Sequence, residues 1–124
     1  MDFLTHPATL IFLGGGTGAV LRYFVHQLLK DASVSFPWHT LLINILGSFA
    51  LGILAVQCKP PSPWYLLLGI GVCGGFTTFS TFSLETVRMM QEGRHAAAFG
   101  YVTASVLAAV IGAWLGLQVT SSAA

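Results

Sequence analysis

Four apolar segments, each of about 20 residues or more, are the feature of this sequence that most limits its fold. They run from about 7 to 29, 38 to 57, 64 to 91 and 95 to 119. About 20 consecutive apolar residues let a helix cross the hydrocarbon core of a bilayer, which is roughly 30 Å thick. Because backbone groups in lipid must be paired within the chain, we predict an all-α membrane protein. It would be a single transmembrane domain over 1–124 with four membrane-spanning helices.

Composition and charge exclude several other classes of protein. Hydrophobic residues make up 55% of the chain and charged residues only 7%, whereas soluble domains carry about 25% charged residues. The net charge of +1 leaves no basic patch for a nucleic acid. The 4 histidines are scattered and have no metal-ligand spacing with a carboxylate or cysteine. No catalytic Ser–His–Asp or Cys–His set can be argued, so we predict that the chain is not an enzyme.

The third segment is too long for one straight crossing. Its 28 residues, from 64 to 91, would form a helix of roughly 42 Å at 1.5 Å per residue. It contains four glycines, at 69, 71, 74 and 75. A run of hydroxyl-bearing residues follows them, in the stretch GGFTTFSTFS at 74–83. We predict a break near 74–78, at mid-membrane depth. Non-helical backbone at that depth must line a cavity or be buried in protein, and such breaks often bind ions.

The groups in the stretch 74–83 suit an anion better than a cation. Its hydroxyls and backbone amides donate hydrogen bonds, and the edges of its phenylalanine rings carry the positive part of the aromatic quadrupole. It contains no carboxylate, whereas cation paths commonly use acidic side chains or rows of carbonyls. It also contains no lysine or arginine, so an anion would bind weakly enough to leave. These residues indicate a path for a small, hard anion.

Further polar side chains within the apolar segments each have two interpretations. Arg22 either extends to the membrane surface or attracts an anion at the mouth of a path. Asn44, a lone amide in an apolar run, either joins helices or lines a solute path. Tyr101 and Ser105, one turn apart on one face, either satisfy each other and the backbone or form a polar stripe. Glu85 is either an ion-pair anchor or part of the site beside the hydroxyl stretch.

Glycines recur at the four-residue spacing of closely packed membrane helices. The pairs are Gly14 and Gly18, Gly71 and Gly75, and Gly112 and Gly116. GGGTGA at 14–19 also matches a dinucleotide-binding pattern, but no strand–helix–strand unit surrounds it. The glycine faces favour a tight bundle that forms an oligomer. Lysines and arginines are too few on either side to set a single orientation by the positive-inside rule.

Three stretches resemble the Fluc/CrcB family of fluoride channels: GGGTGAVLRY at 14–23, TLLINILGSFALG at 40–52 and GVCGGFTTFSTFSLE at 71–85. The resemblance covers nearly the whole chain. It implies a protein of the cell inner (plasma) membrane that assembles as an antiparallel, dual-topology homodimer with two pores. It also implies passive, electrogenic export of fluoride. Fluoride would enter as neutral HF, dissociate in the cytoplasm and leave under the negative-inside membrane potential.

The same resemblance implies roles for individual residues. Phe79 and Phe82 would present ring edges to fluoride, and Phe76 would serve packing. Ala109 stands where the polar track of the fourth helix would continue, which shortens the track. The other implied residues are the pore amide Asn44, the hydroxyls of Thr81 and Ser83, the track residues Tyr101 and Ser105, the vestibule residue Arg22, and Gly74 and Thr77, whose backbone carbonyls would bind a structural sodium ion at the dimer interface.

Two other functions are compatible with four apolar segments. One is a non-conducting membrane protein, such as an assembly partner that dimerises through its small faces. The hydroxyls and phenylalanines of 74–83 disfavour it, because packing alone does not need so many hydrogen-bond donors. The other is a proton-coupled transporter of a small solute, which requires a titratable group at mid-membrane. Glu85 is the nearest candidate, and we expect it to lie off-centre.

Overall fold

The computed structural model describes residues 2–123, with side chains described through residue 119. Within that range every regular element is helical, and four helical stretches are long and apolar enough to cross a membrane. This confirms the prediction of an all-helical, multi-pass membrane protein. The elements are η1 (Phe3–Thr5), α1 (Pro7–Leu29), α2 (Trp38–Gln57), the π-helix η2 (Tyr65–Cys73), α3 (Gly74–Phe76), α4 (Phe79–Gln91) and α5 (His95–Ala123).

Local sequence explains where several of these helices begin and end. Pro7 occupies the first turn of α1, where its missing N–H removes no helical hydrogen bond. The His6 imidazole nitrogen caps that turn by accepting a hydrogen bond from the Ala8 N–H at 3.1 Å. At the far end of α4, Gly93 adopts a positive φ of 77°, a conformation that glycine reaches without steric cost. The chain therefore turns sharply there and enters α5.

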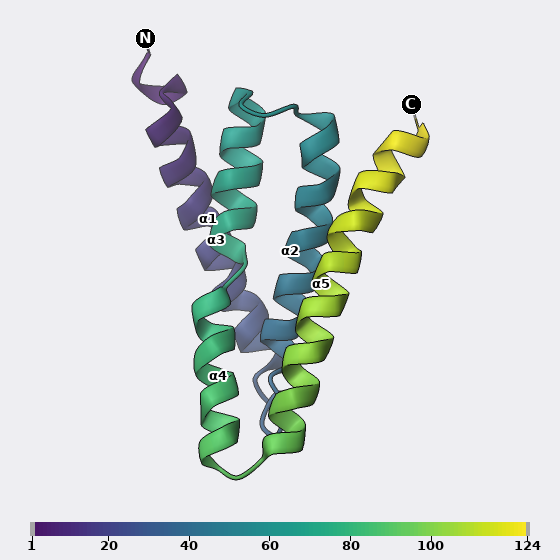
Figure 1. Ribbon diagram of the computed structural model, residues 1–124. Helices are drawn as coiled ribbons and strands as arrows, with labels where there is room; N and C mark the ends of the chain where they lie inside the picture. Colours follow the sequence, from purple (N-terminus) through teal and green to yellow (C-terminus); the bar gives the residue numbers. More distant parts are fainter. Residues whose placement is uncertain (1, 124) are drawn as a thin grey trace.

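The chain runs up and down, so that both termini lie at the same end of the molecule (Figure 1). Two helix pairs pack closely: α1 against η2 and α3, and α2 against α5. Glycines make both contacts possible. A Cβ added to Gly71 would lie 2.8 Å from the Gly14 Cα, and one added to Gly116 would lie 3.1 Å from the Gly52 Cα. The glycine spacing noted in the sequence thus serves helix packing within one chain.

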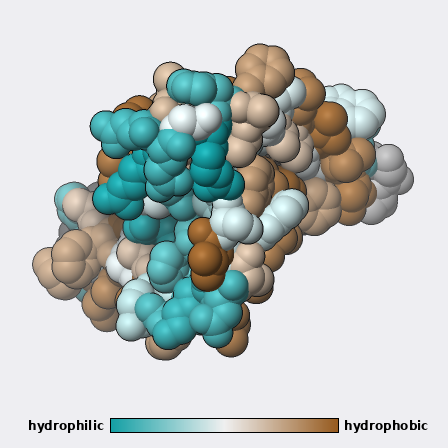
Figure 2. Space-filling model, turned by 90° about the horizontal axis from the view of Figure 1, so that it is seen from below, coloured by the Kyte–Doolittle hydropathy of each residue, from teal (hydrophilic) through white to brown (hydrophobic). Residues whose placement is uncertain are grey.

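The buried core is small and lies toward the end of the molecule that holds the α4–α5 turn. Its members are Leu41, Phe82, Met89, Ala98 and Tyr101. Hydrophilic side chains gather at the end of the molecule seen in Figure 2. Large apolar side chains along the flanks stay exposed in the single chain, among them Phe12, Leu28, Phe99 and Val110. An outer surface of this kind is suited to lipid or to a second protein chain.

Candidate functional site

Two residues with extended backbone angles separate α3 from α4. Thr77 has φ −82° and ψ 157°, and Thr78 has φ −152° and ψ 113°. The Thr77 hydroxyl donates back to the Cys73 carbonyl at 3.0 Å. The Thr78 hydroxyl caps α4 by accepting from the Thr81 N–H at 3.1 Å, as N-cap threonines commonly do. The hydroxyls in this stretch therefore satisfy part of the backbone that the helices leave unpaired.

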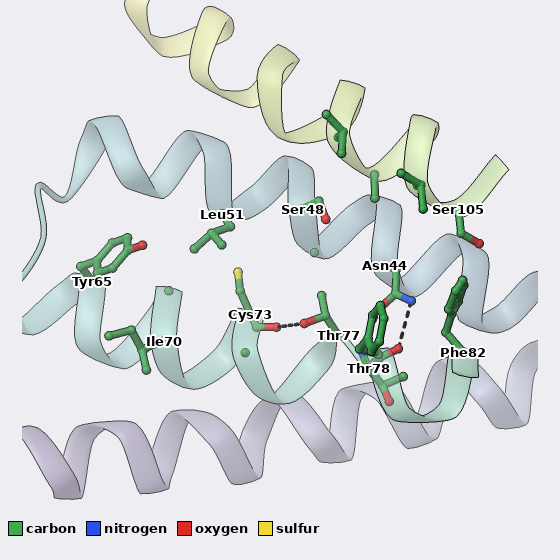
Figure 3. A pocket seen from close by; sticks show the side chains of 17 residues that line it. Asn44, Ser48, Leu51, Tyr65, Ile70, Cys73, Thr77, Thr78, Phe82 and Ser105 are labelled. Carbon is green, nitrogen blue, oxygen red and sulfur yellow. Dashed lines mark hydrogen bonds between the residues drawn. The ribbon is translucent and has the colours of Figure 1, made fainter. Parts of the chain in front are cut away.

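The Asn44 amide of α2 holds this interruption in place. Its Oδ1 accepts from the Thr78 N–H at 2.8 Å, and its Nδ2 donates to the Thr78 carbonyl at 3.2 Å, the latter drawn in Figure 3. Because the Thr78 N–H donates to Asn44, it does not bond to the Gly74 carbonyl one turn back. Asn44 keeps one N–H free of these two bonds, since a primary amide carries two donors.

Arg22 of α1 contacts the same region from the opposite side. Its Nε donates to the Gly75 carbonyl at 3.2 Å, at the carboxyl-terminal part of the short helix α3. A cation near the final carbonyls of a helix is electrostatically favourable. Arg22 therefore links α1 to the end of α3, a third role beside the two that the sequence left open.

A cavity of about 570 Å³ lies between α2 and α5 on one side and η2, α3 and the start of α4 on the other. Figure 3 shows its lining from these elements. No charged side chain lines it. Six of the residues singled out in the sequence do so: Asn44, Gly74, Thr77, Phe79, Phe82 and Ser105. Ala109, where the polar track was expected to stop, lines it as well.

The two expected pore phenylalanines lie side by side but in different surroundings. Their ring centroids are 5.5 Å apart. Phe82 is 8% exposed and packs on the Tyr101 ring with centroids 5.1 Å apart. Phe79 is 80% exposed in the single chain. A phenylalanine this exposed at the mouth of an apolar cavity is available for contact with another molecule.

The two expected track residues of α5 have different partners. Ser105 is 6% exposed, lines the cavity, and its buried hydroxyl has no hydrogen-bond partner in the described part of the chain. Tyr101 is fully buried and lies outside the cavity lining. Its hydroxyl donates to Glu85 Oε1 at 3.1 Å. A buried unpaired hydroxyl is costly, so it marks a site where a ligand or water is expected.

Thr81 and Ser83 do not line the cavity of the single chain. The Ser83 hydroxyl donates to the Phe79 carbonyl of its own helix at 2.9 Å. Thr81 lies in the first turn of α4, where its N–H is capped by Thr78. Neither residue meets Asn44 or Ser105 in the cavity wall. Their expected contact with an ion stays a prediction.

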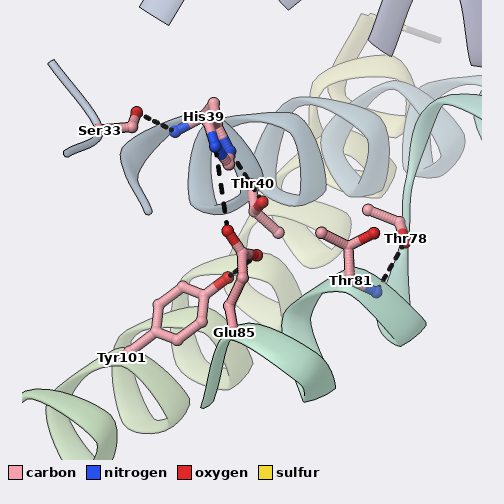
Figure 4. Close-up of polar contacts among 7 residues, drawn as sticks. All are labelled: Ser33, His39, Thr40, Thr78, Thr81, Glu85 and Tyr101. Atoms are coloured by element: carbon pink, nitrogen blue, oxygen red, sulfur yellow. Dashed lines mark hydrogen bonds and ion pairs between the residues drawn. The ribbon is translucent and has the colours of Figure 1, made fainter. Parts of the chain in front are cut away.

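A polar cluster beside the cavity was not recognised in the sequence (Figure 4). His39 Nε2 lies 3.9 Å from Glu85 Oε2, and His39 Nδ1 lies 2.9 Å from the Thr40 hydroxyl. Tyr101 donates to the other oxygen of Glu85. The only sequence signal was the presence of two histidines, His26 and His39, near the ends of consecutive apolar segments. This pattern says nothing about a distant carboxylate.

The backbone around the interruption offers oxygens that could hold a cation. Within the described residues, no group of three or more histidine, cysteine or acidic side chains could bind a metal ion. No hydrogen bond outside the helices, in that same part of the chain, reaches the Thr77 carbonyl. The Gly74 carbonyl lacks the Thr78 N–H that a continuing helix would supply. Unwound backbone carbonyls of this kind are ligands that sodium uses in membrane proteins, so the residues fit such an ion.

Comparison with known proteins matches most of the chain. The profile of the family described as "CrcB-like protein, Camphor Resistance (CrcB)" matches residues 9–117. A protein of Phocaeicola vulgatus is 42% identical over 112 residues, which cover 87% of this chain and 93% of the relative. One of Methylobacterium nodulans is 45% identical, covering 89% and 92%. One of Erythrobacter litoralis is 45% identical, covering 91% of each chain. All three relatives carry the name "Fluoride-specific ion channel FluC".

Proposed function

Because this chain belongs to the CrcB-like protein family, whose relatives compared above are named fluoride-specific ion channels, we propose that it is a passive, fluoride-selective channel. The prediction that the chain is not an enzyme is confirmed by this membership, since the family is one of ion channels. In the proposed transport process, fluoride moves down its electrochemical gradient. No bond of the protein is made or broken.

The observation that carries this proposal is that the buried Ser105 hydroxyl, a hydrogen-bond donor, lines a cavity whose wall holds no charged side chain among the described residues. The Ser105 hydroxyl is buried and has no hydrogen-bond partner among the residues that the structure describes, and it shares the cavity with the Asn44 amide and the Phe82 ring. Hydroxyl and amide hydrogens and aromatic ring edges all present positive charge to an acceptor. Fluoride is small and accepts hydrogen bonds strongly. Neutral donors stabilise such an anion without the tight binding that a buried arginine or lysine would cause.

The single chain supports an assembly of two copies. Phe79 is 80% exposed beside a cavity of about 570 Å³, and a second chain would cover both. We propose an antiparallel, dual-topology homodimer with one pore lined around each cavity, two in all. The interruption at Thr77 and Thr78 would lie at mid-membrane depth, shielded by the partner. Lys59 lies in the connection at one end of the bundle and Lys30 and Arg94 in the connections at the other, so the bias in positive charge is small, which is compatible with insertion in both orientations.

A sodium ion would stabilise this dimer at its centre. Gly74 is the first residue of α3 and Thr77 follows its last residue, and both residues line the cavity wall. Two copies would supply four oxygens. When bound, the ion would supply fixed positive charge and satisfy carbonyls that otherwise lack partners in lipid.

The proposed setting is the cell inner (plasma) membrane. Fluoride that enters as neutral HF dissociates in a neutral cytoplasm and is trapped there as an anion. A passive path lets a negative-inside potential expel it, worth about 2.3 kcal/mol per 100 mV for one charge. A channel needs no coupled ion for this task, and the protein would confer fluoride resistance.

The proposal is tested by fluoride release from vesicles that contain purified Phe79→Ile, Phe82→Ile or wild-type protein. Isoleucine keeps the apolar bulk but has no ring edge, so we expect each variant to reduce fluoride flux at least about tenfold. Phe99→Ile is the matched control, because Phe99 is an exposed phenylalanine (75%) of α5 outside the cavity lining. Wild-type flux in both pore variants would contradict the ring-edge mechanism.

A further inference from the structure

Two histidines from neighbouring helices stack beside the acidic side chain of α4. The rings of His26 in α1 and His39 in α2 have centroids 4.3 Å apart and planes tilted by 40°. His39 is 7% exposed, whereas His26 faces the exterior of the single chain. His39 Nε2 points toward Glu85 Oε2 at 3.9 Å (Figure 4). The pair thus connects the outer surface to a half-buried carboxylate.

The charged and titratable groups around this pair are few. From α4 they are Glu85 and, one turn on, Arg88. From α5 the group is Tyr101, whose hydroxyl donates to Glu85 Oε1. Neutral contacts are the Thr40 hydroxyl at His39 Nδ1 and the Ser33 hydroxyl, which accepts from the His39 backbone N–H. No ion pair within 4.0 Å joins Arg88 to Glu85 in the described part of the chain. In that part of the chain, the protonated His39 imidazole is therefore the only cationic side chain within 4.0 Å of the Glu85 carboxylate.

This arrangement places the His39 ring, which can gain a proton, beside the Glu85 carboxylate. Histidine ordinarily changes charge between about pH 5 and pH 8. The negative charge of the Glu85 carboxylate favours a proton on the neighbouring His39 ring. The contact between His39 and Glu85 accordingly changes from a net negative charge to a neutral ion pair when His39 gains a proton.

The cluster lies next to the proposed ion path. Glu85 is one helical turn beyond Phe82, and Tyr101 touches both, stacking on Phe82 and bonding to Glu85. Phe82 and Ser105 form the adjoining wall of the cavity. A bare carboxylate at this position repels an approaching anion, and an imidazolium beside it cancels the repulsion.

We propose that His39, on which the His26 ring stacks, acts as a proton-dependent positioning residue, which neutralises Glu85 at the Phe82 end of the cavity and raises anion flux as the pH falls. The inference rests on the proposed function, because it describes how fluoride passes one end of that path. It has a chemical logic, since more HF enters a cell when the surroundings are acidic. The path would open most when the fluoride load is greatest.

The test compares fluoride release at about pH 7.5 and about pH 5.5, equal on both sides of the vesicle, with release from protein-free vesicles subtracted at each pH. We expect wild-type flux to rise about threefold at the lower pH, the scale of cancelling one nearby charge. His39→Gln should flatten this response. His95→Gln, an exposed histidine at the start of α5, should keep it.

A wild-type response that persists in His39→Gln overturns the inference, as does a flat wild-type profile in vesicles that release fluoride. Absence of fluoride release at every pH overturns the proposed function instead.

Because His39 is buried and its replacement could impair folding, imidazole NMR of the wild-type protein provides a second measurement. We expect the His39 ring to gain its proton at lower pH in Glu85→Gln than in the wild-type protein, because the variant removes the neighbouring negative charge. A ring that stays neutral down to about pH 4.5, or a midpoint unchanged by Glu85→Gln, would rule out the pair.

Discussion

At the scale of single residues, hydroxyl groups of similar appearance in the sequence have different tasks. Ser83 and Thr86 donate to carbonyls of their own helix, and Thr78 caps α4. Ser105 alone is buried with no partner for its hydroxyl among the described residues. A structural hydroxyl would be bonded, whereas one that serves a passing ion must be free to bond it. Ser105 is therefore the hydroxyl whose loss should affect flux most selectively.

Ser105→Ala should reduce fluoride flux about tenfold, because a hydrogen bond to a charged group contributes about 1.5–3 kcal/mol. Thermal stability in detergent should be unchanged or slightly higher, since the variant removes an unpaired buried hydroxyl. Thr103→Val, at an exposed position of the same helix, should change neither quantity. Normal flux in Ser105→Ala would show that the ion does not depend on this hydroxyl. Strong destabilisation would show that the hydroxyl has a structural role.

The residue types around the cavity could be predicted from the sequence, but their bonds could not. Asn44 was singled out as an amide in an apolar run, yet its two hydrogen bonds to Thr78 join residues 34 positions apart. The contact of His39 with Glu85 likewise depends on how α2 meets α4. Local pattern carries no information about such distant pairs. The types of side chain at the site could therefore be predicted from the sequence, whereas their hydrogen-bond and ion-pair partners required the three-dimensional structure.

At the scale of helices, glycine backbones set how closely the pairs approach. A Cβ added to Gly75 would lie 2.9 Å from the Gly15 carbonyl carbon and 3.0 Å from its Cα. Both are backbone atoms, so no side chain can move aside. Arg22 donates to the carbonyl of the same glycine. The α1–α3 contact therefore fixes the position of the interruption on which the proposed site depends.

Gly75→Ala should lower the thermal midpoint by at least about 5 °C, the effect of overpacking at a close helix contact, and should also reduce flux. Gly100→Ala is the matched control, because a Cβ there meets nothing within 4 Å. That variant should be neutral or slightly stabilising, since alanine favours a helix over glycine. Equal stability of the two variants would show that the α1–α3 contact is looser than its geometry indicates.

The number of membrane-length helices followed directly from hydropathy, but their internal form did not. The structure has the four such helices that the sequence predicts. It also has a π-helix over Tyr65–Cys73, a rare form often associated with functional sites. That segment is almost uniformly apolar, so it has no periodicity from which to infer its winding. The course of the polar track on α5 beyond Ser105 was left open for another reason, because an alanine stands at position 109.

At the scale of the whole molecule, the proposed channel is an assembly of two chains. Its cavity is bordered by a phenylalanine, Phe79, that is 80% exposed, and the carbonyls of Gly74 and Thr77 lack helical partners. In lipid, such carbonyls need protein, water or an ion beside them. In the proposed dimer, the second copy would cover Phe79, and a shared sodium ion would bind the two carbonyls.

Replacing sodium with a large organic cation such as N-methyl-D-glucamine should therefore destabilise the dimer. In detergent we expect a lower dimer fraction at dilution and a lower thermal midpoint, because binding stabilises only the assembled state. Adding sodium back should restore both. Sodium chloride at the same ionic strength as the organic salt controls for screening. A dimer of unchanged stability in sodium-free buffer would contradict a structural role for the ion.

The central claim is that fluoride crosses alone, as a charged ion through a passive path. The most direct test loads vesicles containing the protein with potassium fluoride at equal pH on both sides and follows external fluoride with an electrode. The account predicts little release until valinomycin lets potassium follow, and then rapid release without any pH gradient, because one charge moves with each fluoride. Release that requires a proton gradient, or no release from folded protein, would contradict it.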